Sequence, residues 1–175
     1  GVIAMSIVSQ VCNFTFLGLW GKWADRFSNK SVLAVSGPLF LGSIFAWTFT
    51  SVTEWHFLTW PLLTVIHIFM GISTAGTAIA GGNIGLKLAP KGQGTAYLVA
   101  LSLVNSLAAG IAPVIGGKGA DFLAPYSLSF ILQWAGPGGK SLFTPVYLRH
   151  WDFLFGLAFL IGFYALHRLT LVEEK

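Results

Sequence analysis

Long stretches without a charged side chain constrain this chain more than any other feature of its sequence. Asp, Glu, Lys and Arg are absent from 1–21, 31–53, 55–86 and 92–117, and from a shorter run at 153–167. A helix that crosses a bilayer needs about 20 apolar residues, and a charge at its centre costs about 2.5–3.5 kcal/mol. The runs therefore predict five membrane-spanning segments.

The composition agrees with a membrane location. Charged residues make up 9% of the chain, whereas soluble domains carry about 25%. So few charges would leave the surface of a water-soluble globule largely uncovered, and we expect the lipid bilayer to be the main partner. The runs are continuously apolar, which favours helices over the alternating strands of a barrel. The sequence thus predicts an all-α, multi-pass integral membrane protein with a single transmembrane domain, 1–175.

The expected helices are placed between the charged segments, and their spans are 1–20, 32–52, 58–86, 93–116 and 151–170. The segment 117–150 contains an apolar stretch, Phe122–Trp134, that is interrupted by Pro125 and is too short to cross the membrane. We expect it to form an extracytoplasmic interfacial or re-entrant piece and no sixth crossing.

Basic residues set the expected orientation. Alternate gaps hold most of them: Lys22, Arg26, Lys30, Lys87, Lys91, Arg168 and Lys175. The opposite set holds Lys118, Lys140 and Arg149. The positive-inside rule places the first set, and with it the C-terminus, in the cytoplasm of a plasma or inner membrane. Tryptophans near the span ends are expected to be interface anchors: Trp20, Trp23, Trp55, Trp60 and Trp151.

The first cytoplasmic loop carries the most specific motif, G-K-W-A-D-R-F-S-N-K-S-V-L from Gly21 to Leu33. It resembles the loop signature of the major facilitator superfamily, G-x-L-A-D-R-x-G-R-K-x-x-L. The matching residues are Gly21, Ala24, Asp25, Arg26, Lys30 and Leu33, and the departures are Trp23, Ser28 and Asn29. An ordinary basic loop between two spans is the alternative, but it does not require six matches in register.

The loop also has a physical reading. Gly21 would let two helix ends approach closely, and the carboxylate of Asp25 would be attracted by a helix N-terminus. The helix that opens at Gly92 and Gly94 offers such an end, and the resemblance implies this pairing as a gate. The resemblance also implies that basic residues of the motif pair with an acid on a neighbouring helix. No acid lies between Glu54 and Asp121, and Asn29 occupies a basic position, so such a charge relay is not expected within this chain.

The fourth span contains a Gly-Pro-rich stretch from Gly110 to Gly117. It resembles the G-P-x-x-G-G ending of the family's antiporter motif, with Ala112 in place of Gly. Pro113 would permit a bend, and Gly116 and Gly117 would permit another helix to pack closely. Generic small-residue packing explains the same residues, so the stretch does not indicate antiport.

Four larger polar side chains lie inside the predicted spans: Gln10, Asn13, His67 and Asn105. Polar groups at this depth usually face the bundle interior or a water-filled cavity, so these residues are candidates to line a solute pathway. His67 could also carry a proton, because imidazole titrates near neutral pH. The alternative is that they join helices by hydrogen bonds, which contribute about 0.6 kcal/mol each on average.

Other classes of function find little support in the sequence. The histidines lack the spacing of a metal site, and no nucleophile and base lie together, so neither an enzyme nor a bound metal or cofactor is expected. The basic residues form no run that would indicate a nucleic-acid partner.

The resemblance implies part of a secondary-active solute transporter that works by alternating access. The five spans match helices eight to twelve, in the C-terminal half of such a protein, because the loop motif is degraded. The expected partners are then a small solute and the missing N-terminal helices or other half of the transporter. The alternative is a non-transporting integral membrane subunit of a larger complex, which would leave the loop signature unexplained.

Overall fold

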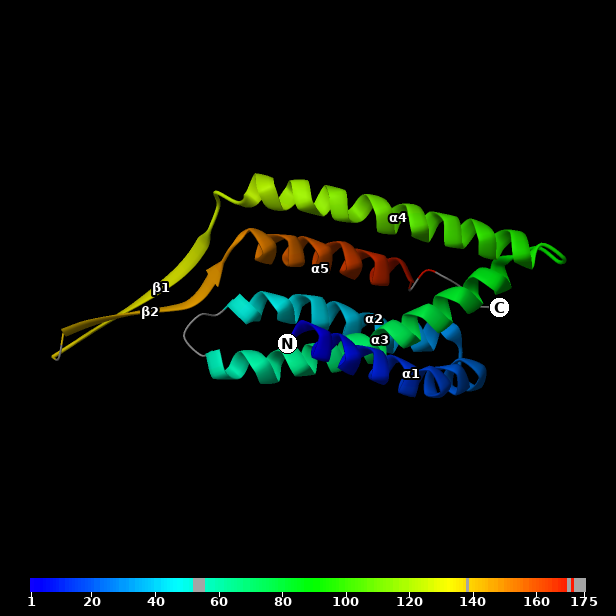
Figure 1. Cartoon of the computed structure of the whole chain (residues 1–175), viewed down its shortest axis with the longest axis horizontal. Helices are drawn as coiled ribbons and strands as arrows, with labels where there is room; N and C mark the ends of the chain where they lie inside the picture. The colour runs from blue at the N-terminus through cyan, green and yellow to red at the C-terminus, as the bar shows by residue number, and fades with distance from the viewer. Residues whose placement is uncertain (52–55, 138, 170, 172–175) are drawn as a thin grey trace.

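Helices dominate the computed structural model, which describes residues 1–51, 56–137, 139–169 and 171 (Figure 1). In this part of the chain, five helices are long and apolar enough to cross a membrane, as the sequence predicts. The elements are α1 (Val2–Arg26), α2 (Asn29–Trp47), the 3-10 helix η1 (Thr48–Ser51), α3 (His56–Leu88), α4 (Gly94–Leu123), β1 (Leu128–Gly136), β2 (Gly139–Leu148) and α5 (His150–Leu169).

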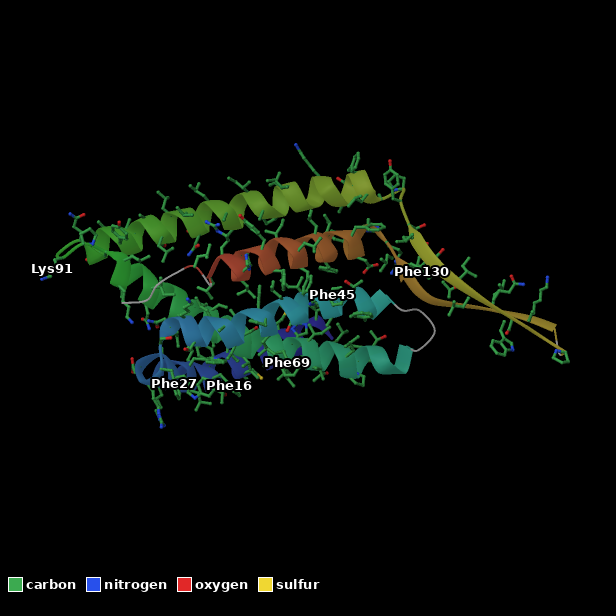
Figure 2. All side chains as sticks on the ribbon, turned by 180° about the vertical axis from the view of Figure 1, so that it is seen from behind. Phe16, Phe27, Phe45, Phe69, Lys91 and Phe130 are labelled. Carbon is green, nitrogen blue, oxygen red and sulfur yellow. The ribbon has the colours of Figure 1, made fainter. Side chains whose placement is uncertain are left out.

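The five helices run along the long axis of the molecule in alternating directions (Figure 1). Helix α3 packs against both α1 and α2, α5 packs on α2, and α4 contacts α5 and α3. The α1–α2 and α3–α4 turns lie at one end of the bundle and the hairpin at the other; Figure 2 shows Phe27 and Lys91 together at the turn end. This arrangement groups the basic loops as the sequence predicts, while the side of the membrane stays a prediction.

Glycines of α3 allow its two neighbours to approach closely. A Cβ at Gly71 would overlap the backbone carbonyl oxygen of Ser9 on α1. A Cβ at Gly76 would lie 2.6 Å from Cβ of Ser36 on α2 and 3.1 Å from the ring of Trp20 on α1. Helices in lipid associate through such close packing, because hydrocarbon provides no hydrophobic drive between them.

The buried core is small and lies where these three helices meet. It consists of Trp20, Ala24, Val32, Ala75 and Ala80. Most large apolar side chains point outward instead, such as Leu103 and Ile115 of α4, which are 60% and 66% exposed. An apolar exterior around a small core is the pattern of a bundle whose solvent is lipid.

The helix boundaries differ from the predicted ones at the turns. Helix α1 continues to Arg26 and α2 begins at Asn29, so the expected loop 21–31 shrinks to Phe27 and Ser28. The Ser28 hydroxyl accepts a hydrogen bond from the Ser31 N–H at 2.9 Å, which caps α2 early. Helix α4 continues to Leu123, well past the expected end at 116. The ends of the expected spans at 52 and 170 and Trp55 fall outside the described residues.

The prediction of an all-α fold is wrong in the segment 117–150. Strands β1 and β2 form an antiparallel hairpin, with Leu128 opposite Leu148 and Gly136 opposite Gly139. The turn places Gly139 at φ +112°, a conformation that suits glycine. The register shifts between Phe130 and Leu132, where β2 has an extra residue in a stretch that contains Pro145, which lacks the N–H of a regular ladder.

One expected interface anchor has a different role. Trp20 is buried, and its indole Nε1 donates a hydrogen bond to the carbonyl oxygen of Ile72 on α3 at 2.8 Å. It therefore joins α1 to α3 inside the bundle. Trp23, Trp60 and Trp151 are exposed near helix ends, as anchors in a membrane interface would be.

We predict that Gly71→Ala destabilises the bundle by about 1–3 kcal/mol, because a backbone carbonyl cannot rotate away from the added methyl group. The measurement is the free energy of unfolding in detergent micelles titrated with dodecyl sulfate. Gly82→Ala is the matched control on the same helix, since a Cβ at Gly82 meets nothing within 4 Å. Equal stability of the two variants would contradict the close α1–α3 contact.

We predict that Lys91 and Ser129 lie on opposite sides of the membrane, with Lys91 in the cytoplasm, because the basic residues gather at its end. Lys91→Cys and Ser129→Cys should each react with an impermeant maleimide from one side only, in a Cys12→Ser background that removes the chain's single cysteine. Reaction of both from the same side would refute the topology.

Candidate functional site

The loop signature folds into the end of α1, a two-residue turn and the start of α2. Asp25 and Arg26 lie exposed in the last turn of α1. The guanidinium carbon of Arg26 lies 5.5 Å from the centre of the Phe27 ring, a cation–π contact within the motif. Lys30 lies half-buried in the first turn of α2. The motif therefore presents an exposed carboxylate beside cations at the end of the bundle.

A pair of asparagines fixes the turn to α3. Asn29 is 2% exposed, and its Oδ1 accepts a hydrogen bond from Nδ2 of Asn83 at 2.9 Å. In the family signature the position of Asn29 is basic, and the resemblance implies an acid on the facing helix. In this chain the residue at 29 is neutral and its partner Asn83 is an amide as well, so the contact avoids the cost of burying an ion pair. The tie between the helices is thus a neutral hydrogen bond.

A second tie lies deeper, below the signature. The hydrogen bond from Trp20 to Ile72 sits beside Gly76, where the side chains of α1 and α2 both reach α3. The Oγ of Ser36 is buried at this junction and has no hydrogen-bond partner within the described chain. Trp20 and the asparagine pair together join α1, α2 and α3 into one unit that carries the loop signature.

The structure does not bring Asp25 to the helix end at Gly92 and Gly94. Gly92 is at φ +82° in the α3–α4 turn and Gly94 begins α4, at the same end of the bundle as Asp25. However, α1 and α4 do not pack against each other, and α4 contacts α3 and α5 instead. The pairing of Asp25 with this helix end stays a prediction.

The close approach expected at Gly21 is wrong. Gly21 lies inside α1, and a Cβ there would meet nothing within 4 Å. The close contacts are at Gly71 and Gly76 of α3, which sequence reasoning did not single out. Their spacing along a long apolar helix rich in small residues was the available signal.

The candidate pathway residues lie on different faces and are not gathered into one site. On α1, Gln10 is exposed and Asn13 is half-buried. On α4, Asn105 is exposed and lines a shallow concavity of about 470 Å³ together with Ser102 and Ser106. Because α1 and α4 are not in contact, a common pathway would need these two faces to be completed by further helices.

His67 has a defined neighbour inside the bundle. It is half-buried on α3, and its ring meets Trp47 of α2 edge to face, with centroids 5.9 Å apart and planes at 78°. Trp47 in turn lies against Phe155 of α5, at 6.1 Å between centroids. In this structure the imidazole therefore contributes to the packing of α3 against α2, and Trp47 continues that packing to α5.

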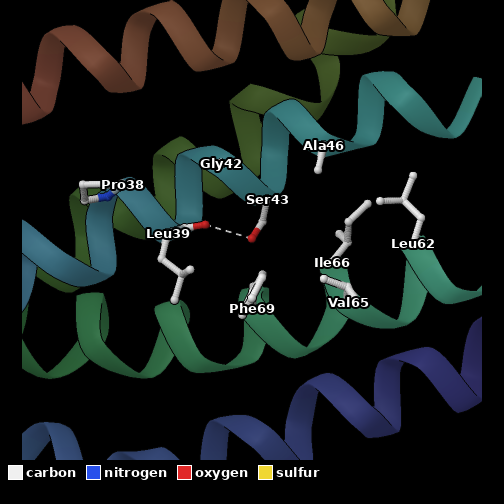
Figure 3. Close-up of a pocket in the computed structure, with 9 residues that line it drawn as sticks. All are labelled: Pro38, Leu39, Gly42, Ser43, Ala46, Leu62, Val65, Ile66 and Phe69. Atoms are coloured by element: carbon white, nitrogen blue, oxygen red, sulfur yellow. Dashed lines mark hydrogen bonds between the residues drawn. The ribbon is translucent and has the colours of Figure 1, made fainter.

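An apolar groove of about 310 Å³ opens between α2 and α3 (Figure 3). Pro38, Leu39 and Ala46 line one wall, and Ile66 and Phe69 line the other. The Ser43 hydroxyl in the groove already donates to the Leu39 carbonyl at 2.8 Å, as the dashed line shows. Such a surface fits an acyl chain or an apolar side chain better than a polar solute.

In the Gly-Pro-rich stretch of α4, residues 110–115 are exposed and Gly116 and Gly117 are half-buried. The helix continues through Pro113 to Leu123, and added Cβ atoms at Gly116 and Gly117 would meet nothing within 4 Å. The close helix packing that these small residues would permit is thus not used by the described chain. It remains available to a partner helix.

The residues described contain no group of three or more His, Cys, Asp or Glu side chains that could hold a metal ion. Comparison with known protein families, with curated proteins and with solved structures finds no match to this chain. The loop signature and the arrangement of the helices are the features of this chain that bear on its function.

We predict that Asn83→Leu lowers the free energy of unfolding by about 1–3 kcal/mol, because it leaves the buried Asn29 amide without this hydrogen bond. In a double-mutant cycle, the loss in Asn29→Leu/Asn83→Leu should be smaller than the sum of the two single losses. Strictly additive losses in dodecyl sulfate titrations would show that the two amides do not interact.

Proposed function

We propose that this chain forms part of a secondary-active solute transporter that works by alternating access, with α1–α5 in the places of helices eight to twelve of a major-facilitator-type protein. One observation carries the proposal: the signature from Gly21 to Leu33 falls at a tight turn between two apolar helices. The α3–α4 turn lies at the same end of the bundle, where a gate between cytoplasmic helix ends would be.

Unequal helix contacts support a moving gate. Helices α1, α2 and α3 are held together by the Trp20 and Asn83 hydrogen bonds and by glycine contacts. Helix α4 shares fewer close contacts with its neighbours, and Ala120 is its one buried residue among those described. A firm unit beside a loosely held helix can change its relative position without breaking many interactions.

Asp25 would bias such a movement by its charge. Its carboxylate is exposed and could meet a helix N-terminus, that of α4 or of another part of the transporter, in one conformation of the cycle. This attraction is worth about 0.3–1 kcal/mol when exposed and up to about 2 kcal/mol when partly buried. A factor of ten in a conformational equilibrium requires about 1.4 kcal/mol, so the charge biases the equilibrium without locking it.

Outward-facing amides support the presence of further helices or of a water-filled path. Gln10 and Asn105 are exposed on apolar helices, and hydrocarbon offers them no hydrogen-bond partner. Asn13 lies half-buried on the same helix as Gln10. In the proposed transporter these faces would border the pathway of a small solute between two halves. In the alternative, a non-transporting membrane subunit, they would contact neighbouring subunits.

We predict that Asp25→Asn shifts the conformational equilibrium while leaving membrane insertion intact. In a Cys12→Ser background, a cysteine at Asn13 should react with a water-soluble maleimide, and Asp25→Asn should change that rate several-fold. Asp121→Asn is the matched control, because Asp121 is also exposed but lies at the end of α4 near the hairpin.

Two outcomes of this experiment would count against the proposal. An unchanged rate in Asp25→Asn would remove the gating role. A cysteine at Asn13 that reacts no faster than one at Phe14, which is 73% exposed on α1, would place Asn13 against lipid instead of water.

A further inference from the structure

The β1–β2 hairpin carries one apolar face that no other described part of the chain covers. Alternate residues of a strand point to the same side, and in β1 one side bears Leu128, Phe130, Leu132 and Trp134. These side chains are 47%, 60%, 59% and 77% exposed. The other side bears Ser129, Ile131, Gln133 and Ala135 on β1, with Lys140, Leu142 and Tyr147 opposite them on β2, so it is mixed and the less apolar of the two.

The hairpin is attached to the helices only through its base. Strand β2 contacts α5 and η1, whereas β1 packs against none of the described helices. The links are short: residues 124–127 join α4 to β1, and Arg149 joins β2 to α5. The base of the hairpin therefore lies at the ends of two predicted spans. In Figure 1 the hairpin extends beyond the helix ends. A tilt about its base would break only the few contacts of β2 with α5 and η1.

Charge and residue type point to lipid as the occupant of this face. Lys140 is the one charged residue from 124 to 148, and it pairs with Ala135 on the more polar side. Trp134 lies on the apolar side, and tryptophan is enriched where hydrocarbon meets headgroups. Exposed apolar side chains such as Ile115 and Phe122 of α4 and Leu160 and Phe163 of α5 also cover much of the two helices that flank the hairpin.

The depth is limited by the backbone. The hairpin has two strands, so each has an outer edge of unpaired N–H and C=O groups. Open sheet edges do not occur in hydrocarbon, where these groups would find no partner, but water and headgroups can satisfy them at the surface. The hairpin can therefore lie on the bilayer and cannot cross it.

We propose that the hairpin lies on the bilayer surface on the side opposite the α1–α2 turn, with the apolar face of β1 in the boundary between headgroups and acyl chains. The inference depends on the membrane-spanning helices and is independent of transport. It makes the segment a lipid-contacting element that holds the adjoining ends of α4 and α5 at the surface.

The test compares labels on the two faces of the whole chain in lipid nanodiscs. In a Cys12→Ser background, Leu132→Cys and Gln133→Cys place a nitrobenzoxadiazole fluorophore on opposite faces of β1. Ser141→Cys and Lys140→Cys do the same on β2, since Ser141 pairs with Trp134 and Lys140 with Ala135. A quencher attached to the lipid acyl chains near the headgroups should quench the labels at 132 and 141 several-fold more strongly than those at 133 and 140.

Each other outcome overturns the proposal. Equal and weak quenching at all four positions would mean that the hairpin stands in water. A disulfide between cysteines at position 132 of two chains, with weak lipid quenching, would make a second copy the occupant. Strong quenching at all four positions by a quencher at the bilayer centre would mean that the segment inserts. The quenching of these labels does not depend on transport, so a failure of the proposed function would leave it unchanged.

Discussion

Hydrocarbon supplies no hydrogen-bond partner, and the rest of this structure depends on that constraint. It requires helices for the spans, and it also determines which hydrogen-bond acceptors the polar side chains within them use. Ser43 and Ser73 donate to the carbonyl groups of Leu39 and Phe69 one turn earlier, so their hydroxyls need no other helix. The indole of Trp20 cannot reach its own backbone in this way and donates instead to α3. The hydrogen bond that satisfies the Trp20 indole therefore also joins α1 to α3.

The helices are held together by close approach and not by the exclusion of water. The contacts at Gly71 and Gly76 bring backbone and Cβ atoms of α1 and α2 directly against α3, which multiplies weak dispersion contacts along the helix. Helix α4 lacks this arrangement, because added Cβ atoms at Gly110, Gly116 and Gly117 would meet open space. The difference explains why the chain has a firm part and a loosely held helix, although the loosely held helix α4 is at least as hydrophobic as the others.

The sequence predicted the parts of the fold that depend on composition alone. A charge-free run must be a span, so all five helices were found, but their ends depend on caps such as Ser28 and were displaced by several residues. The hairpin was missed because a short apolar stretch does not by itself distinguish a strand from a helix. Strand pairing depends on partners that are distant in the sequence, such as Leu128 and Leu148. The Asn29–Asn83 bond was missed for the same reason: Asn29 stands out in the sequence only as a departure from the loop signature, and the contact exists only once α2 and α3 are packed.

The neutral Asn29–Asn83 bond bears on how a gate at this loop could operate. A buried ion pair that is broken leaves two uncompensated charges, so it opposes separation strongly. An amide pair loses about 0.5–1.5 kcal/mol net when water replaces the partner. At the turn that carries the signature, this one bond therefore costs little to break, while the close contact at Gly76 and the hydrogen bond of Trp20 hold the three helices together below it. In the proposed gate, Asp25 is the one acid among residues 1–53, and its carboxylate would act beside the cations of Lys22, Arg26 and Lys30.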